Sequence, residues 1–278
     1  MITFMNQDVN LVLSNQNKMY THNINPVLLN LGPVEIRYYG LVYVLGFIFT
    51  FFYLKHLIKN KKIKLTKDQL YDYLLYLILA VLIGGRFFHV FVYNFSYYLT
   101  HPELIFAIWR GGMSFHGALI GVIFATYLFT KKKTVKSTFY ELADRIVIPT
   151  SLLLCLGRIV NFINGELFGT PTNLPWGVRF PDPKGGHFPD FRHPSQIYES
   201  IKNLFIFFIL LAETKIKKRK PGLIFWTFIF LYGTLRFMIE FVRFSYIHYL
   251  GLSIGQYLCI MMIIPSAYIL IKYYIKPR

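Results

Sequence analysis

Long apolar stretches, separated by shorter polar ones, dominate the sequence. Each is roughly 17–25 residues long, which is the length that an α-helix needs to cross a bilayer. Seven of them occur, at residues 36–58, 72–93, 114–130, 144–164, 196–212, 222–243 and 254–275. The pattern predicts an all-α polytopic membrane protein with seven transmembrane helices, of which the third and fifth are the shortest.

Two polar segments precede or interrupt these spans. Residues 1–30 are polar and rich in asparagine, so we expect a leader there, followed by a seven-helix membrane domain over residues 31–278. Residues 165–195, between the fourth and fifth spans, are rich in proline and glycine, which favour turns. This segment is predicted to form a small loop domain on the outer side of the membrane.

Composition and charge support a membrane protein. With 55% hydrophobic and 15% charged residues, the chain is too apolar for an ordinary soluble domain. The net charge of +17 falls mostly in short runs between spans, at residues 59–67, 131–136 and 215–220. Such runs are typical of loops that face the cytoplasm and anionic lipid, so no nucleic-acid partner is expected. Seventeen basic residues lie on this side and five on the other, which predicts an outer N-terminus and an inner C-terminus.

The two cysteines offer little chemistry of their own. Cys155 and Cys259 both lie inside apolar runs, where neither a disulfide framework nor an activated thiol is expected. No metal-ligand spacing, glycine-rich nucleotide loop or Ser-His-Asp order stands out. We therefore infer no cofactor and no obligate protein partner.

Polar residues inside the spans share one predicted depth. Tyr39 and His116 stand near the starts of spans one and three, whereas Arg86, Arg158 and Arg236 stand near the ends of spans two, four and six. With the N-terminus outside, odd-numbered spans begin and even-numbered spans end at the outer surface. These groups are therefore predicted to gather in the outer half of the bilayer, and the inner halves of the spans are apolar.

The segment GRIVNFINGELFG, at residues 157–169, carries the densest polar chemistry. Arg158 and Asn161 are three residues apart and share one helix face, and Asn164-Gly165 is a turn signal that ends the helix. An arginine in an apolar span is costly unless it is paired or faces a wet cavity, which makes it a functional candidate. The alternative is a capped helix end whose arginine reaches the headgroups.

The sixth span carries a second polar stripe. Tyr232, Arg236, Glu240 and Arg243 follow one another at steps of four and three, so they share one helix face. Glu240 is expected to neutralise Arg236. Because the guanidinium fork fits phosphate oxygens, Arg236 together with Arg158 is predicted to hold a phospholipid phosphate.

Several other residues have two readings each. His116, flanked by glycines, is either a general base or a hydrogen-bonded core histidine. Arg86 is either a headgroup contact or the packing partner of a glutamate, and Glu166 either orients an arginine or caps a turn. His193 and Glu199, at the end of the outer loop, either contact a substrate or shape the loop.

These motifs resemble the prolipoprotein diacylglyceryl transferases of bacterial membranes. Residues 157–169 follow the family signature G-R-x-G-N-F-[IV]-N-x-E-x-x-G except at Val160, where the family usually has glycine. Further matches are YYG at 38–40, GGR at 84–86, GGMSFHG at 111–117, RHPSQIYE at 192–199 and YGTLRFMIEFVR at 232–243. The similarity runs from about Pro26 to the last span. Ala118 also departs from the family, where HGG is common, and both departures add bulk that can narrow the lipid cleft.

The resemblance implies a reaction and its participants. A diacylglyceryl group would pass from phosphatidylglycerol to the lipobox cysteine thiol of an exported prolipoprotein, forming a thioether and releasing glycerol 1-phosphate. The partners would be phosphatidylglycerol, the prolipoprotein lipobox segment and membrane lipid, at the bacterial cytoplasmic (inner) membrane with the active site toward the outer leaflet.

The same resemblance assigns site residues. The catalytic candidates are His116, Arg158, Tyr232 and Arg236, and the motif leaves open which residue is the base. The family positions also include Tyr39, Asn161, Glu166 and Gly169 as substrate-binding candidates. To these we add Arg86, Glu199, Glu240 and Arg243, which lie in the matching motifs.

Two other function classes explain part of the pattern. A phospholipid or anion transporter would also use membrane arginines for phosphate, but it needs access from both faces, which the apolar inner halves disfavour. A structural membrane scaffold leaves the arginine pair unexplained.

Overall fold

The structure is a computed structural model that describes residues 19–31, 34–108, 111–244 and 248–275. The chain forms two compact units. The first unit comprises Met1–Val44, Thr150–Lys218 and Trp226–Arg278, and the second comprises Leu45–Pro149 and Arg219–Phe225.

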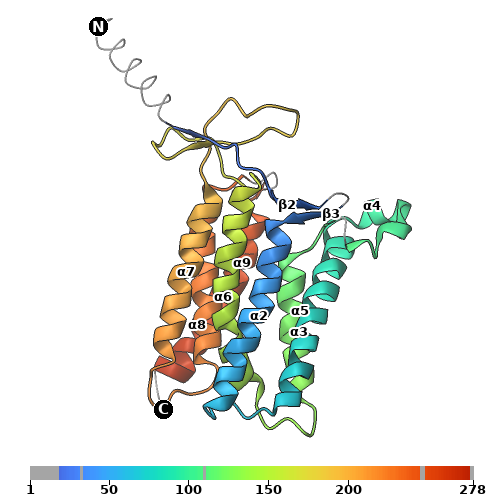
Figure 1. The fold of residues 1–278 in the computed structure, drawn as a ribbon. Coiled ribbons are helices and arrows are strands. Elements are labelled where there is room, and N and C mark those ends of the chain that lie inside the picture. The colour runs from blue at the N-terminus through green and yellow to red at the C-terminus, as the bar shows by residue number, and fades with distance from the viewer. Residues whose placement is uncertain (1–18, 32–33, 109–110, 245–247, 276–278) are drawn as a thin grey trace, which may run out of the picture. The chain divides into compact units, whose positions relative to one another are not determined.

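The described residues are mostly helical (Figure 1). Six apolar helical segments are long enough to cross a membrane, each close to a predicted span. They are α2 (Tyr38–Lys59), α3 with η1 (Lys67–Phe88 and His89–Tyr93), α6 (Phe139–Ile163), α7 (Ser195–Glu213), α8 (Leu223–Glu240) and α9 (Ile254–Leu270), which continues into η4 (Ile271–Ile275). The prediction of an all-α polytopic membrane protein is confirmed at this level. The remaining predicted span corresponds to α5 (Phe115–Thr130), a shorter apolar helix, so the count of seven stays a prediction.

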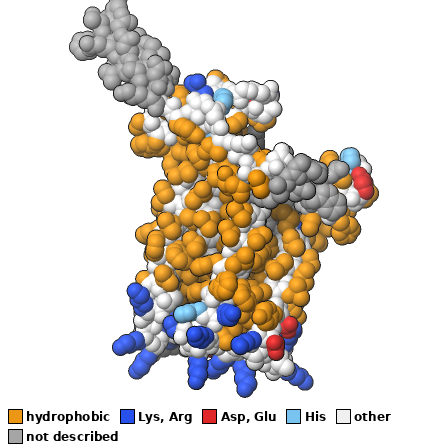
Figure 2. All heavy atoms as spheres, in the orientation of Figure 1, with side chains coloured by type: hydrophobic (Ala, Val, Ile, Leu, Met, Phe, Trp, Pro, Cys, Tyr) orange, Lys and Arg blue, Asp and Glu red, His pale blue; other side chains and the backbone are white. Residues whose placement is uncertain are grey.

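The helix surfaces are suited to lipid. Figure 2 shows hydrophobic side chains covering the visible flanks of the helices, with lysine and arginine side chains gathered at helix ends. Phe52, Ile83 and Phe205, for example, are each more than half exposed although they are large and apolar. Large exposed apolar surfaces of this kind indicate contact with a membrane rather than with water.

Within the second unit, α3 and α5 approach closely through glycine. Gly84 and Gly117 face each other so tightly that a Cβ on either would collide with the backbone of the other. Missing side chains of this kind let membrane helices come into backbone contact. Further along the pair, the Tyr73 hydroxyl lies 2.9 Å from that of Thr126, which satisfies both in the buried interface.

Helices α6, α7, α8 and α9 run alongside one another in Figure 1. Within the first unit, the Cys155 thiol on α6 lies 3.1 Å from the Ser200 hydroxyl on α7, and Gly233 on α8 packs against Cys259 on α9. Helix α9 begins with a capping box, in which Ser253 and Gln256 satisfy each other's backbone N–H groups. These contacts fix the helices that carry the polar stripe predicted from the sequence.

Short strands accompany the helices of the first unit. β1 (Tyr20–Thr21) pairs in parallel with β4 (Val178–Arg179), β2 (Val27–Leu31) pairs with β3 (Val34–Arg37), and β5 (His248–Tyr249) pairs with β6 (Leu252–Ser253). Residues 1–18 of the predicted leader lie outside the described residues. The part that is described contributes β1, so it belongs to the same small sheet as the 165–195 segment.

The 165–195 segment is held together by aromatic rings around one arginine. The Arg192 guanidinium lies 4.4 Å from the ring centroid of Phe188 and 5.3 Å from that of Phe168. The ring of Phe244, just after α8, lies 5.6 Å from the same group. Cation–π contacts of this kind stabilise a nearly buried guanidinium group, so Arg192 can pack in the interior of the segment.

Candidate active site

The end of α6 carries the first part of the site. The helix stops at Ile163, and Gly165 follows with a φ of +67°, a conformation that glycine adopts at little cost. The predicted turn at Asn164-Gly165 is therefore confirmed. It leaves Arg158 and Asn161 on one face of the last turns, where a guanidinium nitrogen of Arg158 donates to Asn161 Oδ1 at 3.3 Å.

Asn161 links Arg158 to two further predicted residues. Its amide nitrogen donates to Glu166 Oε1 at 2.8 Å and to the Tyr39 hydroxyl at 3.2 Å. Glu166 Oε1 also accepts from the Asn164 side chain at 3.1 Å. The Glu166 carboxylate thus holds the turn after α6 and, among the described residues, is linked to Arg158 through Asn161. Its contact with a substrate stays a prediction.

Glu199, on the second turn of α7, is the centre of the site. Its side chain is 1% exposed, although a carboxylate in such surroundings loses its hydration at a cost of several kcal/mol. The start of the helix is pinned nearby, because Ser195 Oγ donates to the Leu167 carbonyl and the Gln196 amide donates to the Glu166 carbonyl. The segment after α6 therefore fixes the position of the carboxylate.

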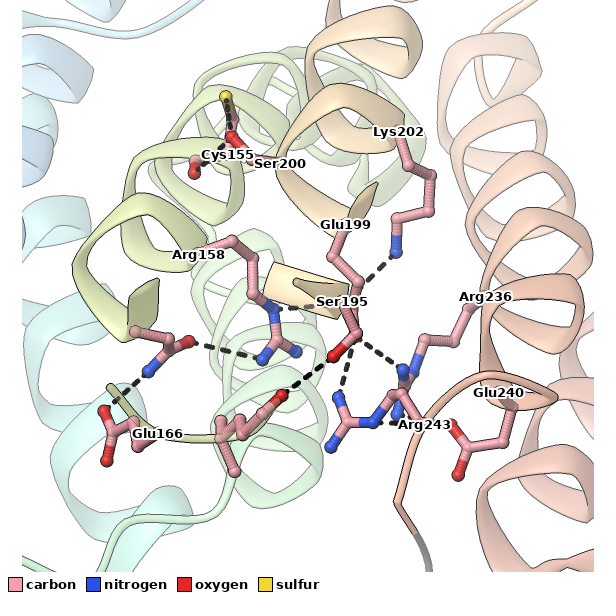
Figure 3. A network of polar contacts seen from close by, with 12 residues as sticks. Cys155, Arg158, Glu166, Ser195, Glu199, Ser200, Lys202, Arg236, Glu240 and Arg243 are labelled. Carbon is pink, nitrogen blue, oxygen red and sulfur yellow. Dashed lines mark hydrogen bonds and ion pairs between the residues drawn. The ribbon is translucent and has the colours of Figure 1, made fainter. Parts of the chain in front are cut away.

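Three guanidinium groups from separate parts of the chain converge on that carboxylate (Figure 3). Arg158 Nε lies 3.1 Å from Glu199 Oε2, and nitrogens of Arg236 and Arg243 lie 2.5 and 2.7 Å from Oε1. Charge-assisted contacts at these distances are the strong kind, and they compensate the desolvation of the carboxylate. We name the residues that share these ion pairs the Glu199 cluster: Arg158, Glu199, Lys202, Arg236, Glu240 and Arg243.

A second carboxylate holds the α8 side of the Glu199 cluster. Glu240 Oε2 lies 2.7 Å from Arg236 and 3.8 Å from Arg243, and Glu240 Oε1 accepts from Ser253 Oγ at 3.0 Å. The predicted pairing of Arg236 with Glu240 is confirmed. The predicted sixth span was too long, since α8 ends at Glu240 and Arg243 lies in the following turn. An antiparallel β-bridge between residues 169 and 243 stabilises this turn.

Gly169 explains why that turn can lie so close. A Cβ at this position would collide with the Val242 carbonyl oxygen and with the His193 side chain. The backbone N–H of Gly169 donates to the His193 carbonyl at 2.8 Å, and the next residue, Thr170, donates to the Val242 carbonyl at 2.9 Å. Gly169 thus brings the 241–243 turn close enough for Arg243 to reach Glu199. Its direct contact with a substrate stays a prediction.

The arginines of the Glu199 cluster are more accessible than the carboxylate that they surround. The side chains of Arg158, Arg236 and Arg243 are 14–16% exposed, against 1% for Glu199. Among the described residues, the ion pairs join four cations and two carboxylates, so two positive charges are in excess. A partly open guanidinium surface with excess positive charge is suited to a phosphate group.

Lys202 is the member that the sequence analysis missed. It lies three residues after Glu199 on α7, with Nζ 3.6 Å from Glu199 Oε2 and 3.9 Å from the ring centroid of Tyr232. Tyr232, a catalytic candidate, is 5% exposed, and this contact with Lys202 places its ring against the cluster. The missed signal was a lysine within an apolar span, on the same face as Glu199.

Two predicted residues belong to the second unit. His116, on the first turn of α5, has its Nδ1 2.9 Å from the Tyr93 hydroxyl. Arg86, near the end of α3, donates to four backbone carbonyl oxygens, those of Leu104, Ile105, Gly111 and Gly112, at 2.6–3.0 Å. Arg86 therefore pins the segment after α4 (Phe95–Thr100). The roles of His116 and Arg86 toward a substrate stay predictions.

Comparison with known proteins identifies the family of the chain. The family described as prolipoprotein diacylglyceryl transferase matches residues 26–272. A phosphatidylglycerol–prolipoprotein diacylglyceryl transferase of Geobacter sulfurreducens is 44% identical over 80% of this chain and 83% of its own. Proteins with the same name from Nitratidesulfovibrio vulgaris and Francisella tularensis subsp. mediasiatica are 41% and 42% identical, over 89% and 93% of this chain and 94% and 96% of theirs. The chain therefore belongs to the prolipoprotein diacylglyceryl transferase family.

Proposed function

We propose that this protein transfers the diacylglyceryl group of phosphatidylglycerol to the cysteine thiol of a prolipoprotein, the first step of lipoprotein maturation. Membership of the family and the names of the relatives support a transferase with these substrates. The observation that carries the proposal is the convergence of Arg158, Arg236 and Arg243 on the Glu199 carboxylate.

The Glu199 cluster is proposed to receive the phosphate of the lipid. Guanidinium groups bind carboxylate and phosphate oxygens with the same fork of N–H donors, so groups already aimed at a carboxylate suit a phosphate as well. The excess positive charge of the cluster favours an anion, and the partial exposure of its arginines provides a route to it. Tyr39, Asn161 and Glu166 then serve to hold Arg158 in place.

The chemical step moves charge toward these arginines. The cysteine sulfur attacks the carbon of the diacylglyceryl unit that is bonded to the phosphate oxygen. The bond between this carbon and the phosphate oxygen breaks as the carbon–sulfur bond forms. The electron pair of the broken bond stays on the phosphate oxygen, which leaves as glycerol 1-phosphate. Guanidinium groups that face this oxygen stabilise the charge as it develops.

The thiol proton needs an acceptor, and we propose His116 for this role. A cysteine thiol has a reference pKa near 8.5, so most of it is protonated at neutral pH and a base accelerates the reaction. The contact between His116 Nδ1 and the Tyr93 hydroxyl supports a fixed orientation of the imidazole ring.

The membrane arrangement belongs to the same proposal. We place the protein in the bacterial cytoplasmic membrane with seven spans, an outer N-terminus and an inner C-terminus. The active site then lies toward the outer leaflet, where an exported lipobox segment emerges. Six apolar helices, the apolar α5 and the asymmetry of the basic loops support this arrangement.

A single assay tests the reaction. The purified protein is incubated with phosphatidylglycerol and a lipobox peptide, and the peptide is analysed by mass spectrometry for a diacylglyceryl thioether on cysteine. A thioether together with released glycerol 1-phosphate supports the transferase. Lipid movement between leaflets without peptide modification would instead indicate transport and would overturn the proposal.

A further inference from the structure

Lys202 is a buried cation that the reaction outlined above does not use. Its side chain is 3% exposed, and it lies on the same face of α7 as Glu199, which is 1% exposed. Burial of an ammonium group is expensive, so a lysine at such a position normally has a strong partner. What holds Lys202 there is therefore informative.

The contacts of Lys202 are electrostatic and incomplete. Its Nζ lies 3.6 Å from Glu199 Oε2 and 3.9 Å from the Tyr232 ring centroid, and it makes no hydrogen bond within the part of the chain that the structure describes. An ammonium group has three N–H donors, which a purely structural lysine would normally satisfy. Lys202 therefore contributes a positive charge to its surroundings rather than a network of hydrogen bonds.

Besides Glu199 on its own helix, three elements contribute charged groups to the surroundings of Lys202. Helix α6 contributes Arg158, α8 contributes Arg236 and Glu240, and the turn after α8 contributes Arg243. Glu166 joins only through Asn161 and is exposed, so solvent screens its charge. Without Lys202 the ion pairs of the cluster would carry one positive charge in excess, and with it they carry two.

That second charge matches the product better than the substrate. A phosphodiester such as phosphatidylglycerol carries one negative charge, whereas a phosphate monoester carries nearly two above its second pKa of about 6. The extra charge appears only as the carbon–oxygen bond breaks. An interaction that strengthens along the reaction accelerates the chemical step instead of tightening substrate binding.

We propose that Lys202 is a positioning residue that tunes the Glu199 cluster for a dianionic phosphate monoester. It acts through Glu199, whose charge it neutralises, so that more of the guanidinium charge is available to the departing phosphate. The inference rests on the proposed function for its choice of ligand. It deepens that function by predicting that the site prefers the leaving group to the lipid headgroup that precedes it.

Binding measurements on the full chain in detergent test this without turnover. Wild-type protein is titrated at pH 7 with glycerol 1-phosphate, which is mostly a dianion above its second pKa of about 6, and with dimethyl phosphate, a monoanion. We expect the dianion to bind at least about tenfold more tightly, because one additional buried charge is worth that order of affinity. Equal affinities in the wild type would overturn the proposal, and this comparison needs no variant.

Three variants then assign the preference to Lys202. Lys202→Met should lose about tenfold in affinity for glycerol 1-phosphate and little for dimethyl phosphate. Lys202→Arg should restore most of the preference, and Lys217→Met, which removes an exposed loop lysine, should match the wild type. Equal losses for both anions in Lys202→Met, or none, would contradict the proposed role.

Turnover adds a second readout and separates this inference from the proposed function. In the transfer assay, Lys202→Met should lower kcat with little change in KM for phosphatidylglycerol, whereas a merely structural loss would reduce the amount of folded protein. If the wild type made no thioether but still preferred the dianion through Lys202, the proposed function would fail and the inference about the cluster would stand.

Discussion

Arg236 and Arg86 are both arginines within apolar helices, yet the structure satisfies them in opposite ways. Arg236 contacts two carboxylates, Glu199 and Glu240, and its side chain stays 14% exposed. Arg86 donates to four backbone carbonyl oxygens and is 7% exposed. A carboxylate contact can be shared with an incoming phosphate, whereas carbonyl oxygens of a loop hold the arginine in place. We expect the chemistry of the partner, more than the depth of the charge, to separate a catalytic arginine from a structural one.

The largest expected effect is on the carboxylate-bound arginines. Arg158→Ala and Arg236→Ala should each reduce thioether formation by about 10³-fold, the upper range for removing one group that stabilises developing negative charge. Initial rates with phosphatidylglycerol and a lipobox peptide measure this. Arg158→Lys and Arg236→Lys are the matched controls, because they keep the charge but lose the fork, and they should fall between. Full activity in either alanine variant would refute the phosphate role.

His116 is expected to come next. His116→Gln should slow transfer by about 10²-fold, the lower range for removing a general base. Membrane insertion and the thermal midpoint of unfolding should stay as in the wild type. The rate should recover in part at higher pH, where more of the thiol ionises without help. Tyr93→Phe keeps the imidazole and removes only its hydroxyl contact, so it should be much milder. A normal rate for His116→Gln at neutral pH would exclude it as the base.

For Arg86 the comparison predicts a loss of stability rather than of catalysis. Arg86→Ala leaves partly buried carbonyl oxygens without their donor, at no more than about 1–3 kcal/mol for an unsatisfied group, so the thermal midpoint in detergent should fall. The KM for phosphatidylglycerol of the remaining folded protein should be unchanged. A raised KM with an unchanged midpoint would show that Arg86 contacts the headgroup and would break the comparison.

The smallest effect is expected at Tyr39. Tyr39→Phe removes one hydrogen bond of 3.2 Å to Asn161, worth about 0.5–1.5 kcal/mol, so transfer should slow by no more than about tenfold. Tyr43→Phe, one turn further along α2, is the control and should leave the rate unchanged. A loss as large as that of Arg158→Ala would give the Tyr39 hydroxyl a direct part in the chemistry.

Sequence reasoning reached the helices and part of the site for physical reasons. The apolar runs and the Asn164-Gly165 turn are local features, so they predicted the helix positions and the end of α6 well. The depth argument put Arg158 and Arg236 at one level, and the structure brings both to Glu199. It put Arg86 at that level too, but depth says nothing about which neighbour a side chain meets.

What could not be predicted depends on contacts between distant segments. Glu199 meets Arg236 and Arg243 across 37 and 44 residues, and no periodicity within one helix encodes such a pairing. The sequence therefore does not predict that Glu199 is the centre of the site, and the sequence analysis did not include Lys202 in it. The early end of α8 has a similar origin, because the turn at Arg243 is stabilised by a bridge to Gly169 rather than by local sequence.

The ring of phenylalanines around Arg192 has a practical consequence for purification. Contacts between a guanidinium and aromatic faces lose little strength as ionic strength rises when they are shielded from water. Buffers rich in phosphate or sulfate should therefore leave the 165–195 segment folded while they compete for the arginines that we propose to bind the lipid phosphate. Preparations intended for crystallisation with a lipid are best exchanged into chloride beforehand, because a carboxylate buffer such as acetate would compete for the same guanidinium groups.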